Sequence, residues 1–209
     1  QIGGAAIQWT PPSDTSAITS YEVYIAYDEQ GSYQVLLWYE DPSSEQMGSH
    51  FPVGTNSFTI FSPTARQTSN PSYPANWVIV YTRSGSTLQS IGDAAKTRLY
   101  DASGSAPGSI SFFPMFVDMG SGGGTIVGTL QWSLPATADL GYTTHYNIYQ
   151  ATDSAGTQKQ ALQTVPLGSN QLVIPSATAC SNGDHLVVYL ANPDGEASSG
   201  AAASVFACR

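Results

Sequence analysis

The chain has 209 residues, a length that allows two domains of ordinary size, each with a core of its own. Its 15 acidic and 6 basic residues give a formal net charge of −9. This balance argues against nucleic acid as a partner, because a nucleic-acid-binding surface needs clustered Lys and Arg. No apolar run reaches the roughly 18 residues of a membrane span, so we expect none. Only 10% of the residues are charged, which is typical of secreted β-proteins and favours an extracellular or cell-surface location.

Apolar residues alternate with polar or small ones over short runs, and each run ends in turn-forming residues. This period of two predicts β-strands, and no stretch keeps helical spacing. In chain order, the pattern predicts strands at 5–9, 20–27, 33–38, 57–61, 76–83 and 96–100, and then at 109–118, 125–132, 144–151, 159–165, 171–174, 185–191 and 202–206. Many short strands at regular turn spacing predict an all-β fold of the sandwich or barrel type.

Four sequence blocks occur twice in the same order, which indicates an internal duplication. SYEVYIAYDEQG (20–31) returns as HYNIYQATDSAG (145–156), a shift of 125 positions. PVGTNSFTI (52–60) returns as PLGSNQLVI (166–174), a shift of 114. VIVYT (78–82) returns as LVVYL, and IQWTPP (7–12) returns as LQWSLP. We therefore predict two domains, 1–103 and 109–209, with the join in the small, turn-forming residues 101–108.

The duplicated motifs resemble those of fibronectin type III domains. IQWTPP (7–12) followed by ITSYEVY (18–24) is similar to the family's second and third strands, and LVVYLANPDG (186–195) is similar to its sixth strand and the turn after it. The resemblance covers nearly the whole chain, twice, and implies two tandem antiparallel Greek-key β-sandwich domains. Trp77 and His185 stand where the family has a tyrosine at the start of the sixth strand, so its tyrosine-corner hydrogen bond is not implied.

The two cysteines, Cys180 and Cys208, both lie in the second domain. In a chain of secreted composition we expect them to form a disulfide that closes a loop of 28 residues. Two free buried thiols are the alternative. This cysteine spacing and three scattered histidines do not form a metal motif, so we expect no metal and no cofactor.

The two copies differ in length between two of the duplicated blocks. The shift falls from 125 to 114, so the first domain carries 11 extra residues within 38–51. Insertions on a rigid sandwich often form binding surfaces, and aromatic groups beside polar ones suit a contact with protein or sugar. The alternative is a longer hairpin whose aromatics cover the end of the sandwich. The candidate contact residues are Trp38, Tyr39, Glu40, Asp41, His50 and Phe51.

A second difference lies at the start of each copy. The second domain has a predicted strand before Trp132, whereas only eight residues precede Trp9, so we expect the first domain to lack its own first strand. An exposed sheet edge is a template for strand addition by another chain. Three explanations remain open. The first is that the chain, which begins with Gln1, is a processed product or a piece of a longer array. The second is that a neighbouring molecule completes the domain, and the third is that the domain tolerates the missing strand.

The predicted strand that opens the second domain is apolar on both faces. An edge strand with one face in water should not be apolar on both, so we expect the second face to pack on the other domain or on a partner. The first face carries Ile110, Phe112 and Phe116, and the second carries Phe113, Met115, Val117 and Met119.

The sequence shows no nucleophile beside a base, and we expect no enzymatic activity. Asp28 and Asp153 recur in both copies, but each opens an Asp-x-x-Gly turn, which explains it. The function we expect is that of a non-catalytic extracellular structural module, a repeat segment or subunit of a fibre, matrix or cell-surface assembly. Its partners would be other protein chains, copies of itself included. The alternative is a ligand-binding accessory module, with a glycan as ligand, that uses the 38–51 insertion.

Overall fold

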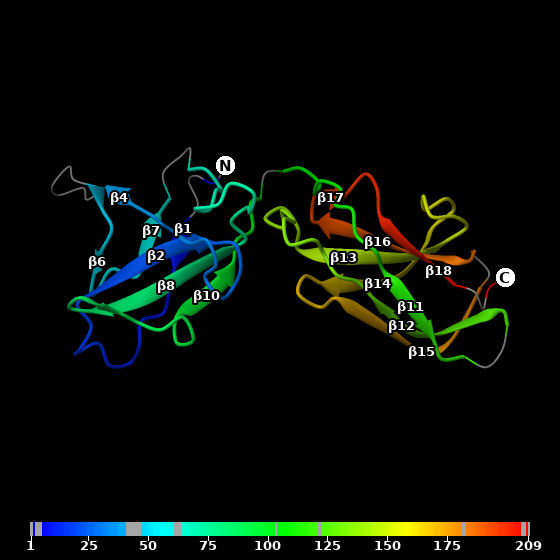
Figure 1. The fold of residues 1–209 in the computed structure, drawn as a ribbon, viewed down its shortest axis with the longest axis horizontal. Coiled ribbons are helices and arrows are strands. Elements are labelled where there is room, and N and C mark those ends of the chain that lie inside the picture. Colours follow the sequence, from blue (N-terminus) through cyan, green and yellow to red (C-terminus); the bar gives the residue numbers. More distant parts are fainter. Residues whose placement is uncertain are drawn as a thin grey trace. The chain divides into compact units, whose positions relative to one another are not determined.

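The computed structural model describes residues 2, 6–40, 47–60, 64–102, 104–120, 123–180, 183–205 and 208, with the backbone alone at 39, 40, 47 and 177. These residues form an all-β structure without an α-helix, and hence without a helix that could cross a membrane. The chain divides into two compact units, Gln1–Asp101 and Ala102–Arg209 (Figure 1).

Unit one pairs all its strands antiparallel. One sheet has the order β1-β7, and the larger sheet has the order β10-β8-β2-β3, with β6 also paired to β2 and β9 to β8. A separate hairpin pairs β4 with β5. The strands are β1 (Ala6–Gln8), β2 (Ser20–Ala26), β3 (Val35–Leu36), β4 (Tyr39–Glu40), β5 (Met47–Gly48), β6 (Phe51–Pro52), β7 (Ser57–Thr59), β8 (Trp77–Ser84), β9 (Thr87–Leu88) and β10 (Ala95–Arg98).

Unit two is also antiparallel and has longer strands. Its smaller sheet has the order β11-β12-β15, and its larger sheet the order β14-β13-β16-β17, with β18 also paired to β16. The strands are β11 (Met115–Asp118), β12 (Thr125–Gln131), β13 (His145–Ala151), β14 (Gln160–Pro166), β15 (Gln171–Ala179), β16 (His185–Asn192), β17 (Gly195–Glu196) and β18 (Ala201–Ser204).

In each unit, strands of both main sheets contribute to one apolar core, which fits a β-sandwich. In unit two, Leu130 of β12 and Ile148 of β13 belong to the same buried cluster, and in unit one Ile7 of β1 and Val23 of β2 do. The alternation of the sequence explains this arrangement, because every second side chain of a strand points to the same face.

The extra residues of unit one interrupt a strand that is continuous in unit two. β14 pairs with the whole of β13 up to Gln150, apart from one bulge. In unit one, β3 pairs with the end of β2, and β6 pairs with its beginning. β3 and β6 therefore correspond to the two ends of β14, and the β4–β5 hairpin is inserted between them. This agrees with the predicted position of the 11-residue insertion within 38–51.

Three predicted strands differ from the observed ones by four or more residues in length. The strand predicted at 109–118 pairs with β12 only from Met115 onward. The strand predicted at 33–38 shrinks to Val35–Leu36, since Tyr33 has a φ of 55°, which no strand allows. The strand predicted at 171–174 continues to Ala179, because the pairing with β12 resumes at Thr178 after a register shift in which residues 175–177 of β15 face Val127 alone.

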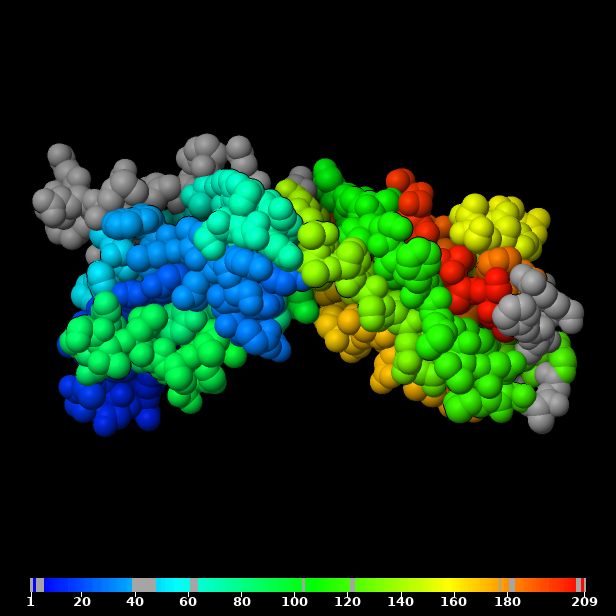
Figure 2. Space-filling model, in the orientation of Figure 1, coloured from blue at the N-terminus to red at the C-terminus, as the bar shows by residue number. Residues whose placement is uncertain are grey.

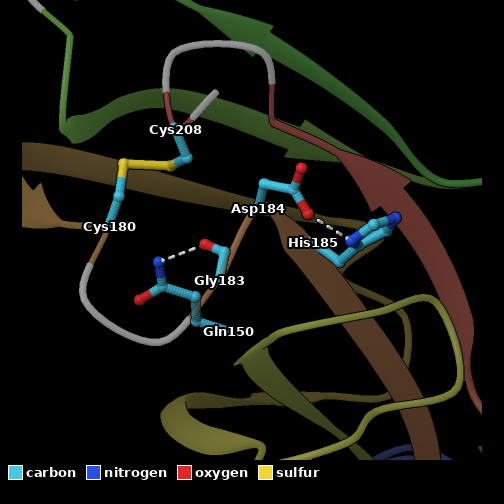
Figure 3. Close-up of a disulfide and its surroundings, with 6 residues drawn as sticks. All are labelled: Gln150, Cys180, Gly183, Asp184, His185 and Cys208. Carbon is cyan, nitrogen blue, oxygen red and sulfur yellow. Dashed lines mark hydrogen bonds and ion pairs between the residues drawn. A yellow bond between two sulfur atoms is a disulfide. The ribbon is translucent and has the colours of Figure 1, made fainter.

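The predicted disulfide is confirmed. Cys180 and Cys208 are bonded, with their Cα atoms 5.4 Å apart (Figure 3). The bond ties the chain beyond β15, in one sheet, to the chain beyond β18, in the other. Beside it, the buried Gln150 donates from Nε2 to the carbonyl oxygen of Gly183 at 2.8 Å. A disulfide is consistent with an oxidising compartment.

We expect the Cys180→Ser/Cys208→Ser double variant to lower the free energy of unfolding of unit two by about 3–4 kcal/mol, because a closed loop of this length restricts the unfolded chain. Hydrogen exchange followed by mass spectrometry, segment by segment, measures this loss. Amides of β8 and β2 in unit one serve as the internal control. An equal loss of protection in both units, or none in β15 and β18, would contradict the prediction.

Candidate functional site

β11 lies in one of the two segments for which the sequence predicts a contact with a partner. Its register with β12 places Met115 opposite Gln131 and Val117 opposite Thr129. Because side chains alternate along a strand, Phe116 points to the other face, where it packs against the core. The two predicted faces of this strand are therefore separated as expected, one inward and one outward.

The outward face of the β11-β12-β15 sheet exposes large apolar side chains. Phe113 is 89% exposed and Met119 is 63% exposed, values unusual for residues of this size in a soluble protein. Val173 joins this face from β15, because it lies across Thr129 from Val117. The green atoms of the segment near residues 110–120 lie on the open surface of unit two in Figure 2. We define the outer row as Phe113, Met115, Val117, Met119 and Val173.

A cleft of about 900 Å³ adjoins the outer row. Phe113, Met115 and Val173 line it together with side chains of β12, β14 and the β14–β15 turn. None of the residues that line it is charged. Four amide side chains are present instead, and they suit neutral hydrogen-bonding ligands. These amides belong to Gln131, Gln163, Asn170 and Gln171.

Sequence reasoning named Phe113, Met115 and Val117, and the structure brings these residues together. It missed Val173 and the amides of the cleft. Val173 had no local signal, because Leu172 and Ile174 on either side are apolar too and the sequence shows no alternation there. The amides had none, since exposed glutamines are frequent throughout the chain.

The 38–51 insertion does not form one aromatic surface among the described residues. Trp38 is 53% exposed, but Phe51 is 0% exposed and belongs to the core of unit one. The expectation that Phe51 contacts a partner is therefore wrong. Its position in β6, paired with Tyr21, directs its side chain inward. Asp41 and the side chains of Tyr39 and Glu40 lie outside the described residues.

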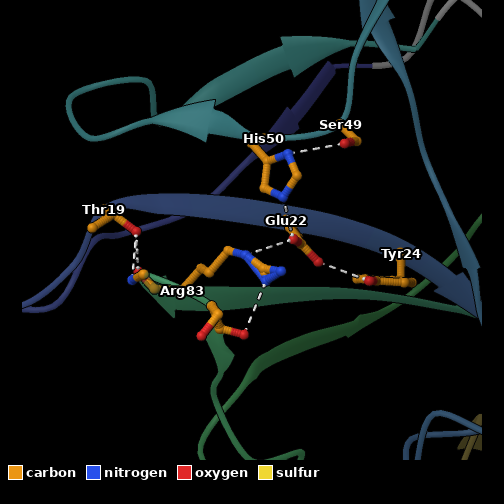
Figure 4. Close-up of polar contacts among 8 residues, drawn as sticks. Thr19, Glu22, Tyr24, Ser49, His50 and Arg83 are labelled. Carbon is orange, nitrogen blue, oxygen red and sulfur yellow. Dashed lines mark hydrogen bonds and ion pairs between the residues drawn. The ribbon is translucent and has the colours of Figure 1, made fainter.

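His50 has a structural partner. Its Nε2 lies 2.8 Å from Oε1 of Glu22, a buried carboxylate of β2 that Arg83 Nε also approaches at 3.3 Å (Figure 4). Tyr24 donates from its hydroxyl to Oε2 at 2.8 Å. Ser49 Oγ lies 3.0 Å from His50 Nδ1, so a serine, a histidine and a carboxylate stand in series. Because Arg83 and Tyr24 also engage Glu22, we interpret the group as an anchor that ties the inserted hairpin to the sheet.

Unit two has a similar carboxylate centre on a different residue. Glu196 of β17 accepts hydrogen bonds from Asn147 Nδ2 at 2.8 Å and from the hydroxyl of Tyr149. Lys159 Nζ lies 2.6 Å from Glu196 Oε2 and stacks over the rings of Tyr149 and Tyr189, 4.4 and 4.1 Å from their centroids. Tyr24 and Tyr149 occupy the same place in the duplication, so each unit uses this tyrosine to hold a carboxylate.

These contacts shift the pKa values of the groups. Burial and then the hydrogen bond to Glu22 raise the pKa of Tyr24 to about 12, and burial and the bond to Glu196 do the same for Tyr149. Burial alone would raise the pKa of Glu196. The hydrogen bonds from Lys159, Tyr149 and Asn147 outweigh burial and hold it below its ordinary value.

The repeated aspartates close turns, as predicted. Asp28 Oδ1 accepts from the backbone N–H groups of Gln30 and Ser32, at 3.1 and 2.9 Å. Asp153 Oδ1 accepts from Ala155 and Thr157, both at 3.0 Å. Within the described part of the chain, no group of three His, Cys, Asp or Glu side chains is arranged to hold a metal ion.

Comparison with models of known protein families and with curated proteins finds no match for this chain.

The lowered pKa of Glu196 predicts an acid-sensitive unit two. A carboxylate whose pKa is lower in the folded than in the unfolded state stabilises the fold at pH values above its unfolded-state pKa. This stabilisation is lost as the pH falls through the folded-state pKa. We therefore expect the protection of β13 and β16 against hydrogen exchange to fall between about pH 5 and pH 3. Glu196→Gln should weaken protection at neutral pH and flatten this dependence.

Glu29→Gln, at an exposed turn of unit one, is the matched control and should leave the profile of β13 and β16 unchanged. An acid profile of unit two that is the same with and without Glu196 would contradict the role given to this carboxylate.

Proposed function

We propose that the chain is a non-catalytic extracellular structural module, a repeat segment or subunit of a fibre, matrix or cell-surface assembly. We further propose that its units are Greek-key sandwiches of the fibronectin type III type. The duplicated motifs support the family assignment. So does the partition of strands in unit two, where the first, second and fifth strands share one sheet and β14, β13, β16 and β18 belong to the other. The disulfide supports an oxidising, extracellular location.

The observation that carries the proposed role is the outer row. An antiparallel sheet with one face in water normally presents polar residues on that face. Here Met115 and Val117 on β11, and Val173 on β15, are 59%, 47% and 51% exposed. Contiguous exposed apolar side chains of this kind mark a surface that another protein covers.

The occupant we propose is a second copy of the chain. In a two-fold dimer the same patch meets itself, so any charge on it would face an identical charge. With a net charge of −9, most of the surface of this chain repels its copies. The outer row and the residues directly beside it on β12 and β15, Gln131, Thr129 and Gln171, carry no charge, so two copies can approach each other there.

We expect concentration-dependent dimers in sedimentation velocity. The Met115→Asp/Val117→Asp variant should raise the dimer dissociation constant by at least about tenfold, because the carboxylates would be buried without partners. Val53→Asp is the matched control, since Val53 is 41% exposed in unit one. It should leave the constant unchanged. A wild-type chain that stays monomeric at every concentration while folded would contradict self-association through the outer row.

A second candidate function is the binding of a neutral glycan, and the cleft favours it more than the insertion does. Amide side chains beside an exposed aromatic such as Phe113 suit sugar hydroxyls and the apolar face of a pyranose ring. An array of neutral oligosaccharides tests this function. Binding that Gln171→Ala abolishes and Gln67→Ala, in unit one, leaves intact would support it. An array without any bound glycan would remove it.

A further inference from the structure

The smaller sheet of unit one has fewer strands than its counterpart. It consists of β1 and β7, whereas unit two has β11, β12 and β15. The duplication aligns β1 with β12, so that Ile7 corresponds to Leu130 and Gln8 to Gln131. β7 corresponds to β15. Among the described residues, no strand of unit one stands where β11 stands in unit two.

The backbone of β1 is oriented to accept such a strand. Trp9 N–H donates to the carbonyl oxygen of Asn56 at 3.0 Å, so Trp9 bonds toward the β7 side. In antiparallel pairing, successive residues bond to opposite neighbours. Gln8 and Ala6 therefore direct their N–H and C=O groups away from β7, to the open edge.

Unit two shows the same geometry with the edge filled. Trp132 N–H donates to Asn170 O at 3.1 Å, and the next residue back, Gln131, lies opposite Met115 of β11. The bond from Met119 N–H to Val127 O, at 2.8 Å, shows that Met115, Val117 and Met119 are the residues that bond to β12. The N–H of Phe116 points away from β12.

The core of unit one is less well covered along this edge. Ile7 is 9% exposed, whereas the corresponding Leu130 is 0% exposed. Trp9 is half-buried, whereas Trp132 is 4% exposed. In unit two, Phe112 is itself part of the core, and Phe116 packs against it from β11. An apolar strand added to β1 would supply the missing cover.

We propose that the open edge of β1 binds a β-strand of another polypeptide, one with large apolar side chains at alternate positions. The bound strand pairs antiparallel with residues 6–8 and directs its apolar face toward Ile7, as β11 does toward Leu130. β1 carries no side chain of the kinds that usually protect an exposed edge, since Ala6, Ile7 and Gln8 include neither a charged residue nor a proline. The inference rests on the proposed function only in treating the chain as a module that works through protein contacts.

The experiment uses a synthetic peptide with the sequence of residues 109–119, SISFFPMFVDM, as the probe. The acceptor is the full chain carrying Met115→Asp/Val117→Asp, so that its outer row cannot bind the peptide. Amide chemical shifts from NMR, recorded during titration, locate the bound peptide. We expect saturable changes at Ala6, Ile7 and Gln8, together with new protection of the Ala6 and Gln8 amides against hydrogen exchange.

Two N-methylated peptides give a matched pair. Methylation of the amide that corresponds to Val117 removes an N–H that would donate to the open edge of β1, and it should weaken binding about tenfold or more. Methylation at the position of Phe116 blocks an outward N–H and should change the affinity less than about twofold. Equal effects of the two methyl groups would overturn the proposed register and, with it, strand addition.

Three further results would overturn the proposal. They are protection of the Ala6 and Gln8 amides in the free chain, shift changes confined to residues 128–131, and absence of binding. Failure of the proposed function is distinguishable from failure of this inference. A wild-type chain that stays monomeric but binds the peptide at β1 would contradict self-association through the outer row and would support strand addition at the open edge of β1.

Discussion

Edge-on packing of a tryptophan against a tyrosine joins the two sheets of each unit, and the rest of the structure depends on it. The ring centroids of Trp9 and Tyr21 are 5.5 Å apart, and those of Trp132 and Tyr146 are 5.0 Å apart. In each pair the tryptophan directly follows a strand of the smaller sheet, β1 or β12, and the tyrosine is the second residue of a strand of the larger sheet, β2 or β13. Such a pair buries a large apolar area in a fixed orientation, so it sets which faces of the two sheets meet.

The tryptophan–tyrosine packing is present in both units, but the strands at the edges of the sheets differ between them. In unit two, the central strand has a continuous neighbour in β14, and β11 completes the smaller sheet. In unit one, the neighbour is split by the inserted hairpin, and nothing among the described residues replaces β11. The buried carboxylate of Glu22 lies on β2 between the residues that pair with β6 and those that pair with β3, and Arg83 and His50 contact it there. The common packing thus permits local change at the edges of the sheets without loss of the core.

The sequence predicted the fold class and most strands because alternation and turn residues act locally. The turns at Asp28 and Asp153 need only a carboxylate that accepts hydrogen bonds from backbone N–H groups two to four residues later in the chain. Gly156, in the second of these turns, has a φ of 85°, and a Cβ there would overlap the hydroxyl of Tyr189. Its recurrence from Gly31 was therefore a structural signal. The disulfide followed from composition and from the location of both cysteines in one domain.

The candidate site was predictable only in part, since it depends on contacts between strands distant in sequence. The outward face of β11 followed from alternation within one strand. Val173 and the amides of the cleft are brought beside it by the pairing of β12 with β15, which no local pattern specifies. Phe51 was misplaced for the same reason. Its neighbours look like a surface insertion, but the register of β6 on β2 turns this one side chain into the core.

Both proposed contacts converge on one position of the fold, the first strand of the smaller sheet. Where the strand is present, in unit two, it covers the core with Phe116 on one side and exposes Met115 and Val117 on the other. Where it has no counterpart among the described residues, in unit one, the backbone of β1 and part of Trp9 are left open. A strand that is apolar on both faces, such as β11, suits both positions. One face covers the core of the unit, and the other face is free to contact a second molecule. A chain that carries both an outer row and an open edge can associate with other molecules at two separate surfaces, as a subunit of an extended assembly requires.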